Sequence, residues 1–89
     1  MTSKLTISEH AREQAARRGV SEASVLEVAG SPEQRRAIRE GREVRQSRIA
    51  DEASGKLYVV RVIVDTSAEG DTVVTVYRSS KIDKYWSKE

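Results

Sequence analysis

The most hydrophobic run of the sequence, residues 57–64, is the feature that most constrains the fold. Its length suits a central β-strand rather than a helix. Successive side chains of a strand point to opposite faces of the sheet. One face would therefore be wholly apolar and would pack on helices: Tyr58, Val60, Val62 and Val64. Arg61 is the one charged side chain of this run, and it belongs to the other face.

A second strand is predicted over residues 72–77, where β-branched and aromatic residues dominate. A buried strand that ends in a polar cluster can hold charged groups rigidly at a surface, as an anion-binding or catalytic site requires. A last strand followed by a solvated basic tail would give the same pattern. Tyr85 and Trp86 close the segment, and this pair either stacks on unpaired bases or fixes the tail to the domain. The cations and hydroxyls that follow the strand are Arg78, Ser79, Ser80, Lys81 and Lys84.

Two helices are predicted in the first third of the chain. Ser8 is suited to cap the first helix, which should run to about Arg18 and end at Gly19. Ser21 is suited to cap a second, shorter helix, which residues 30–32 end. Three apolar side chains of the second helix are expected to be buried: Val25, Leu26 and Val28.

Residues 33–40 and 43–50 alternate in a mostly polar pattern, which predicts two strands at outer positions of a sheet with limited burial. Residues 4–7 could add a short edge strand. The predicted fold class is α+β: two N-terminal helices packed on a four-stranded antiparallel sheet with a short C-terminal helix. With 89 residues and no linker or repeat, the chain is expected to form a single domain over residues 1–89 with one small core.

Composition excludes several kinds of site. The chain has no cysteine and a single histidine, so thiolate and multi-histidine metal sites are excluded within one chain. We expect no metal and no cofactor. No apolar run approaches the roughly 20 residues that cross a bilayer, and no signal-peptide core is present. We therefore expect a soluble, cytoplasmic protein with no membrane partner.

The distribution of arginine favours a nucleic-acid partner. The net charge is only +2, but residues 31–50 carry six arginines against three glutamates. Arginine is also better suited than lysine to bidentate phosphate contact. A high arginine content would equally follow from genomic base composition. Four arginines of the predicted strands could form a cationic face that binds a phosphate backbone, or could pair with carboxylates across strands: Arg45, Arg48, Arg61 and Arg78.

His10 stands out because histidine exchanges protons readily near neutral pH. His10 and Arg17 lie seven positions apart, so they fall about 20° from each other on a helical wheel. Both border the narrow apolar stripe of the first helix. A packing or capping role is the alternative reading of a single histidine on a helix.

Metal-independent RNA cleavage needs two proton transfers and stabilisation of a charged phosphorane, while the 2′-hydroxyl attacks the neighbouring phosphate. The chain offers a candidate for each role. His10 would act as general base or acid, and Tyr77 as a positioning or acid group. The cations that contact the phosphate would be Arg17, Arg78 and Lys81. The predicted RNA-binding residues are Arg45, Arg48, Arg61, Lys84 and Tyr85.

Several short motifs resemble one small protein family. They are His10-Ala11 in the first helix, Arg18-Gly19-Val20 at its end, Val74-Thr75-Val76-Tyr77 in the last strand, and residues 80–86 after it. Together they resemble the domain of unknown function 4258 family, and residues 80–86 resemble one bacterial branch of it. That family in turn is similar to RelE/ParE-like and BrnT-like toxins, small α+β ribonucleases usually made beside an antitoxin. The family pattern has an arginine where this chain has Gln14.

The resemblance implies a RelE-like or barnase-like toxin fold, with His10 and the region of Tyr77 as functional positions. The leading hypothesis is a bacterial endoribonuclease of toxin–antitoxin type, a hydrolase acting on free or ribosome-bound RNA. One alternative is a non-catalytic RNA- or ribosome-binding module. Another is an interaction domain for an acidic antitoxin, to which residues 33–50 would offer an open sheet edge. The enzyme hypothesis depends on His10 lying against the cationic end of the last strand.

Overall fold

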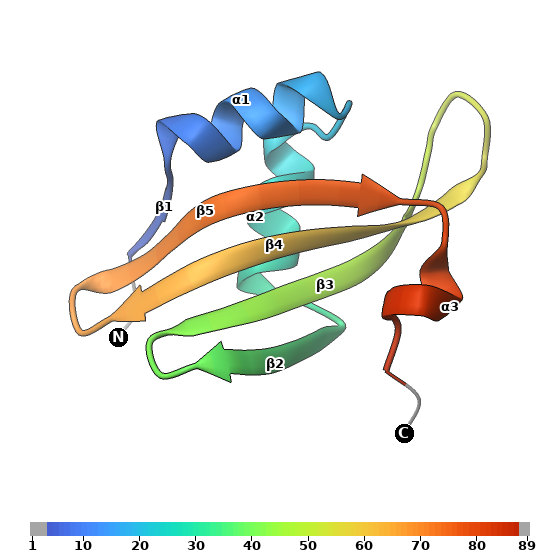
Figure 1. Cartoon of the computed structure of the whole chain (residues 1–89). Coiled ribbons are helices and arrows are strands. Elements are labelled where there is room, and N and C mark those ends of the chain that lie inside the picture. The colour runs from blue at the N-terminus through green and yellow to red at the C-terminus, as the bar shows by residue number, and fades with distance from the viewer. Residues whose placement is uncertain (1–3, 88–89) are drawn as a thin grey trace.

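The computed structural model describes residues 4–87 and packs two helices against one face of a five-stranded sheet (Figure 1). No helix in the described part of the chain is long and apolar enough to span a bilayer. The elements follow in the order β1 (Leu5–Ile7), α1 (Glu9–Arg17), α2 (Glu22–Gly30), β2 (Gln34–Arg39), β3 (Arg42–Ala50), β4 (Leu57–Ser67), β5 (Gly70–Ser79) and α3 (Ile82–Tyr85).

The sheet has the strand order β1-β5-β4-β3-β2, in which β2 to β5 form an antiparallel meander. The strand predicted near the N-terminus is β1, which pairs parallel to β5 and places Ile7 opposite Val73. The expectation of a four-stranded antiparallel sheet was therefore wrong, because the sheet has five strands and is mixed. β1 has only three residues, and so short an alternation does not indicate which strand β1 pairs with or whether the pairing is parallel. The strands predicted over residues 57–64 and 72–77 are both longer than expected, since β4 continues to Ser67 and β5 spans Gly70–Ser79.

Both predicted helix starts are confirmed. The Ser8 hydroxyl accepts a hydrogen bond from the Ala11 N–H at 3.0 Å, and the Ser21 hydroxyl accepts one from the Ser24 N–H at 3.1 Å. Each bond satisfies one of the backbone donors left unpaired in a first helical turn. Leu26 is a correction: it was expected to be buried but is 40% exposed. The buried side of α2 follows helical spacing instead, through Val25, Val28 and Ala29.

The core lies between the helices and the apolar side of β4 and β5. Val60, Val62 and Val64 of β4 are buried there, as the alternation of residues 57–64 predicted. Ala11 and Ala15 of α1 are buried against the sheet and leave little bulk between helix and strand. The backbones therefore approach closely enough for the Gln14 side chain to accept a hydrogen bond from the Val76 N–H at 3.0 Å.

A buried arginine ties the helix side of the sheet together. Arg45 of β3 is 5% exposed and donates to the Ala29 carbonyl at 2.6 Å, to Glu43 at 2.7 Å and to Asp71 at 2.9 Å. Burial alone would lower the pKa of Arg45, but the two carboxylates outweigh it and raise that pKa. Burial would raise the pKa of Glu43, and hydrogen bonds from Arg45 and Arg35 lower it overall.

We predict that Arg45→Ala lowers the free energy of unfolding by about 3–5 kcal/mol, because Glu43 and Asp71 lose a buried partner. The control is Arg42→Ala, which breaks a partly exposed ion pair with Asp65 and should cost much less, because water screens that pair. Urea denaturation followed by circular dichroism measures both. A loss no greater for Arg45→Ala than for Arg42→Ala would contradict the buried network.

We also predict that Gly70→Ala destabilises the protein by more than about 1 kcal/mol. Gly70 has a φ of +142°, and a Cβ placed there would lie 2.4 Å from the carbonyl oxygen of Lys4, so the start of β5 would have to separate from the residues before β1. Gly30→Ala is the matched control. Gly30 is helical, and a methyl group added there would meet no atom within 4 Å outside its own helix and chain neighbours, so this change should stabilise by about 0.5–1 kcal/mol. If the midpoint of thermal unfolding shifts in the same direction for both variants, the predicted clash at Gly70 is refuted.

Candidate functional site

The face of the sheet opposite α1 and α2, here called the outer face, gathers polar side chains from four strands. The register places Gln46 of β3 opposite Arg61 of β4, and Arg61 opposite Tyr77 of β5. Directly paired residues project to the same side of a sheet, so these side chains lie in one row. Gln34 of β2 pairs with Gln46 and extends the row. The polar side chains that define the outer face are Gln34, Arg36, Gln46, Arg48, Arg61 and Tyr77.

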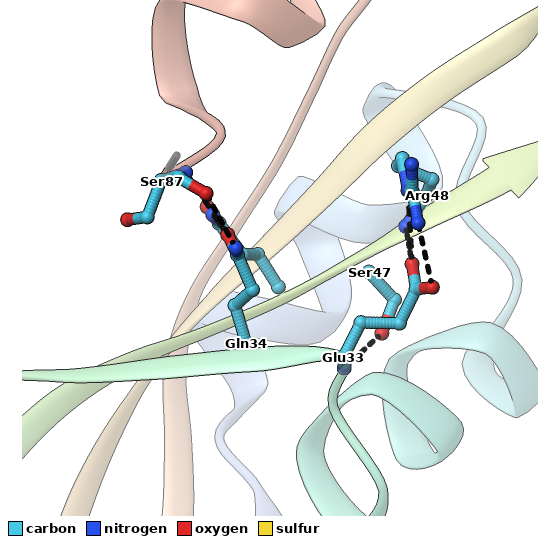
Figure 2. A network of polar contacts seen from close by, with 6 residues as sticks. Glu33, Gln34, Ser47, Arg48 and Ser87 are labelled. Carbon is cyan, nitrogen blue, oxygen red and sulfur yellow. Dashed lines mark hydrogen bonds and ion pairs between the residues drawn. The ribbon is translucent and has the colours of Figure 1, made fainter. Parts of the chain in front are cut away.

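Residues 85–87, here called the C-terminal segment, lie across this face. The Gln34 amide donates to the Ser87 carbonyl at 2.8 Å and accepts from the Ser87 N–H at 3.1 Å (Figure 2). Arg36 also donates to the Ser87 hydroxyl. The Gln46 amide donates to the Tyr85 carbonyl at 3.0 Å. Main-chain and hydroxyl groups of Ser87 and the main-chain carbonyl of Tyr85 therefore hold the C-terminal segment on the sheet and leave the two rings for other contacts.

Aromatic rings and guanidinium groups alternate on the outer face. The Arg61 guanidinium lies 4.5 Å from the centre of the Tyr85 ring and 5.4 Å from that of Tyr77. The Arg48 guanidinium lies 4.4 Å from the centre of the Trp86 ring. Cations attract the electron-rich faces of such rings, and each contact is worth about 0.5–1 kcal/mol where it is exposed. All three rings remain partly exposed.

Arg61 is the central cation of this face. Its Nε donates to the Gln46 side-chain oxygen at 2.9 Å, and its Nη1 lies 3.4 Å from the Tyr77 hydroxyl. Within residues 4–87, no carboxylate lies within ion-pair distance of Arg61 or Arg36. Arg48 differs, because it pairs with Glu33 at 3.2 Å (Figure 2). That hydrogen bond lowers the pKa of Glu33.

The predicted cationic face is divided between the two sides of the sheet. Arg48 and Arg61 lie on the outer face, whereas Arg45 is buried on the helix side. Arg78 also lies on the helix side, since its strand partner is Val60 of the core. Side chains of neighbouring strand residues point to opposite sides, so Tyr77 and Arg78 cannot share a face. Arg45 and Arg78 are therefore not part of the outer face.

The predicted catalytic group is divided in the same way. His10 and Arg17 are exposed on the first and last turns of α1, the helix that covers the other side of the sheet from Tyr77. Lys81 and Lys84 are exposed around α3. The structure does not bring His10 against Tyr77, and the catalytic roles of these residues stay predictions. No group of three or more acidic or histidine side chains in the described ranges could hold a metal ion.

Sequence reasoning missed the amides that organise the outer face. Gln46 is 4% exposed and makes hydrogen bonds with Gln34, Arg61 and the C-terminal segment. Glutamine in a polar strand gives no signal by itself. A signal was present in the spacing. Gln34 and Arg36 are two residues apart, as are Gln46 and Arg48, so each pair points to one side of its strand. It becomes readable only once the hairpin register is known.

Comparison with known proteins identifies one family. No curated protein and no solved structure gave a significant match. The model of the family described as Domain of unknown function (DUF4258) matches residues 7–78, from the end of β1 almost to the end of β5. The matched part therefore includes both helices that cover the sheet and leaves out the C-terminal segment. Since the match covers most of the sequence, the chain belongs to the DUF4258 family.

Proposed function

We propose that this protein binds single-stranded RNA through the outer face of its sheet. The single observation that carries the proposal is Arg61, a partly buried cation at the centre of that face with no carboxylate partner among residues 4–87. Withdrawing a charge from water is costly unless a partner of opposite charge or hydrogen bonds compensate it. An anion supplied from outside, such as a phosphate group, would satisfy the guanidinium donors that remain.

The aromatic rings of the outer face favour an RNA whose bases are unpaired. Tyr85 and Trp86 each lie against a guanidinium on one side and are partly exposed. A base could stack on the exposed side of each ring, and stacking of this kind contributes about 1–3 kcal/mol per base. Bases of a duplex are already stacked on one another and offer no such surface. Rings and arginines in one row therefore suit a single strand, with bases on the rings and phosphates near the cations.

Two further features of the proposal rest on the resemblance to RelE-like and BrnT-like proteins. These are a toxin-type role in the cytoplasm, with a ribosome-bound RNA as one target, and a cognate antitoxin as partner. An antitoxin would have an accessible edge at β2, the last strand of the sheet, whose residues from Arg35 onward are exposed. Arg36 and Arg39 make that edge cationic, which suits an acidic partner strand.

RNA cleavage on the same face is a second candidate function, favoured by the 3.4 Å contact between Arg61 Nη1 and the Tyr77 hydroxyl. When the 2′-hydroxyl attacks the neighbouring phosphate, Arg61 would stabilise the charge of the phosphorane. Tyr77 would position the phosphate or give its proton to the departing 5′-oxygen, and the proton of the attacking 2′-hydroxyl would pass to solvent water. This arrangement uses Tyr77 in place of His10, which α1 holds on the other side of the sheet.

We predict that Arg61→Gln weakens binding of a fluorescein-labelled single-stranded RNA by about tenfold and lowers the salt slope of log K by about one, because one phosphate contact is lost. Trp86→Ala should weaken binding without changing the slope, because stacking releases no counterions. Arg12→Gln is the charge-matched control, since Arg12 lies on α1 and pairs with Glu22. Fluorescence anisotropy across a salt series measures all three. If the Arg61→Gln and Arg12→Gln variants bind the RNA with equal affinity, the outer face is not the RNA-binding surface.

For the second candidate, we predict that RNA incubated with the protein in EDTA is cleaved to products ending in a 2′,3′-cyclic phosphate. Tyr77→Phe should slow cleavage by about a hundredfold or more, the usual contribution of a positioned proton donor. Arg12→Gln again controls for loss of a positive charge. If His10→Ala abolishes cleavage and Tyr77→Phe does not, the chemistry belongs to α1 and the assignment to the outer face is wrong.

A further inference from the structure

A cleft of about 430 Å³ opens on the helix side of the sheet, away from the outer face. It lies between the α1–α2 connection and the turn that joins β3 to β4. Its volume falls within the range of about 300–1,000 Å³ that is usual for small-molecule sites. The lining includes an apolar floor of Val20, Ile49 and Val60, and one arginine, Arg78.

Arg78 is held in place but its donors are unused. Its guanidinium lies 4.2 Å from the centre of the Tyr58 ring. A methyl group added at Gly19 would lie 3.7–3.9 Å from Cζ and both Nη atoms of Arg78, so Gly19 rests against the flat side of the group. Within residues 4–87, the Arg78 side chain makes no ion pair and no hydrogen bond. A planar donor group that is oriented by packing and left without an acceptor is prepared for a phosphate.

The turn after β3 makes part of the lining acidic. Asp51 and Glu52 of this turn line the cleft together with the hydroxyl-bearing Ser21 and Ser24. Hydrogen bonds from Ser54, and to a smaller extent the positive charge of Arg78, lower the pKa of Asp51, so this carboxylate is ionised at neutral pH. Both of these bonds go to one oxygen, Oδ2, and leave the other available to accept. Carboxylates accept hydrogen bonds from the amino groups of nucleobases.

We propose that this cleft is a nucleotide-binding site, in which Arg78 takes the phosphate and the acidic turn takes an amino-bearing base. The apolar floor would cover one side of the base. Cytosine, with an amino donor at N4, suits the carboxylates, whereas uracil presents a carbonyl oxygen at the same position and would be repelled. The site is independent of the RNA surface proposed for the outer face, because the sheet separates the two.

The test is a titration with cytidine 5′-monophosphate, followed by amide chemical shifts in two-dimensional NMR spectra. We expect shifts at Gly19, Ser21 and Ser24 at millimolar nucleotide, with a Kd at least about tenfold higher for Arg78→Gln. Arg78→Lys should recover only part of the affinity, because it keeps the charge and loses the planar fork. Arg39→Gln is the control, an exposed arginine of β2 far from the cleft along the sheet.

Uridine 5′-monophosphate and inorganic phosphate complete the experiment. We expect both to bind more weakly than the cytidine nucleotide, and Asp51→Asn to reduce the difference between the two nucleotides. The proposal is overturned if the nucleotide shifts only outer-face amides, if Arg78→Gln leaves its Kd unchanged, or if inorganic phosphate binds equally well. None of these results depends on RNA binding, so the outer-face proposal stands or falls separately.

Discussion

The side-chain alternation of β4 and β5 is the constraint on which the rest of this structure depends. Alternate residues of β4 are buried valines committed to the helices, and Val62 among them pairs with the buried Val76 of β5. The side chains of the residues between these valines must point to the opposite face of the sheet. Arg61 and Tyr77 must therefore face away from the helices and face each other across the strand pair. The polar row of the outer face is the geometric complement of the apolar core.

The same constraint gives the two sides of the sheet different chemistry. On the outer face, arginines meet aromatic rings along a row of paired strand positions, which suits an extended ligand. On the helix side, the loops beyond the core enclose a cleft, and Arg78 enters it just past the buried part of β5. Arg45 has neither role, because three acceptors bind it in the interior. The side of the sheet and the position along the strand, and not residue type, together decide which arginine is accessible.

Local features of the fold could be predicted from the sequence, because their causes are local. Ser8 and Ser21 cap helices, since each capping pattern lies within a few residues. Residues 57–64 form a strand, and their alternation correctly places Val60, Val62 and Val64 in the core. The parallel pairing of β1 could not be predicted, because its partner strand β5 lies 66 positions further along the sequence, as Ile7 opposite Val73 shows. Leu26 was misplaced because each helical position is turned by about 100° from the one before it. Leu26 therefore points away from the buried side of α2, which carries Val25, Val28 and Ala29.

The candidate site could be predicted only in part, for the same physical reason. The residue types were identified, including Arg61, Tyr77 and Tyr85. Their grouping depends on strand register, which couples residues far apart in the sequence and leaves no local trace. His10 was grouped with Tyr77 on side-chain chemistry and on the family resemblance. The sheet lies between the helix that carries His10 and the face that carries Tyr77.

The two hydrogen bonds between Gln34 and Ser87 hold the C-terminal segment independently of the core. These two residues are 53 positions apart, yet each contributes a donor and an acceptor to the other. The core cluster, by contrast, contains no residue beyond Val76. Separate contacts therefore hold the interior and the C-terminal segment. Loss of the bonds to Ser87 would uncover the arginine–aromatic surface and leave the packed interior unchanged.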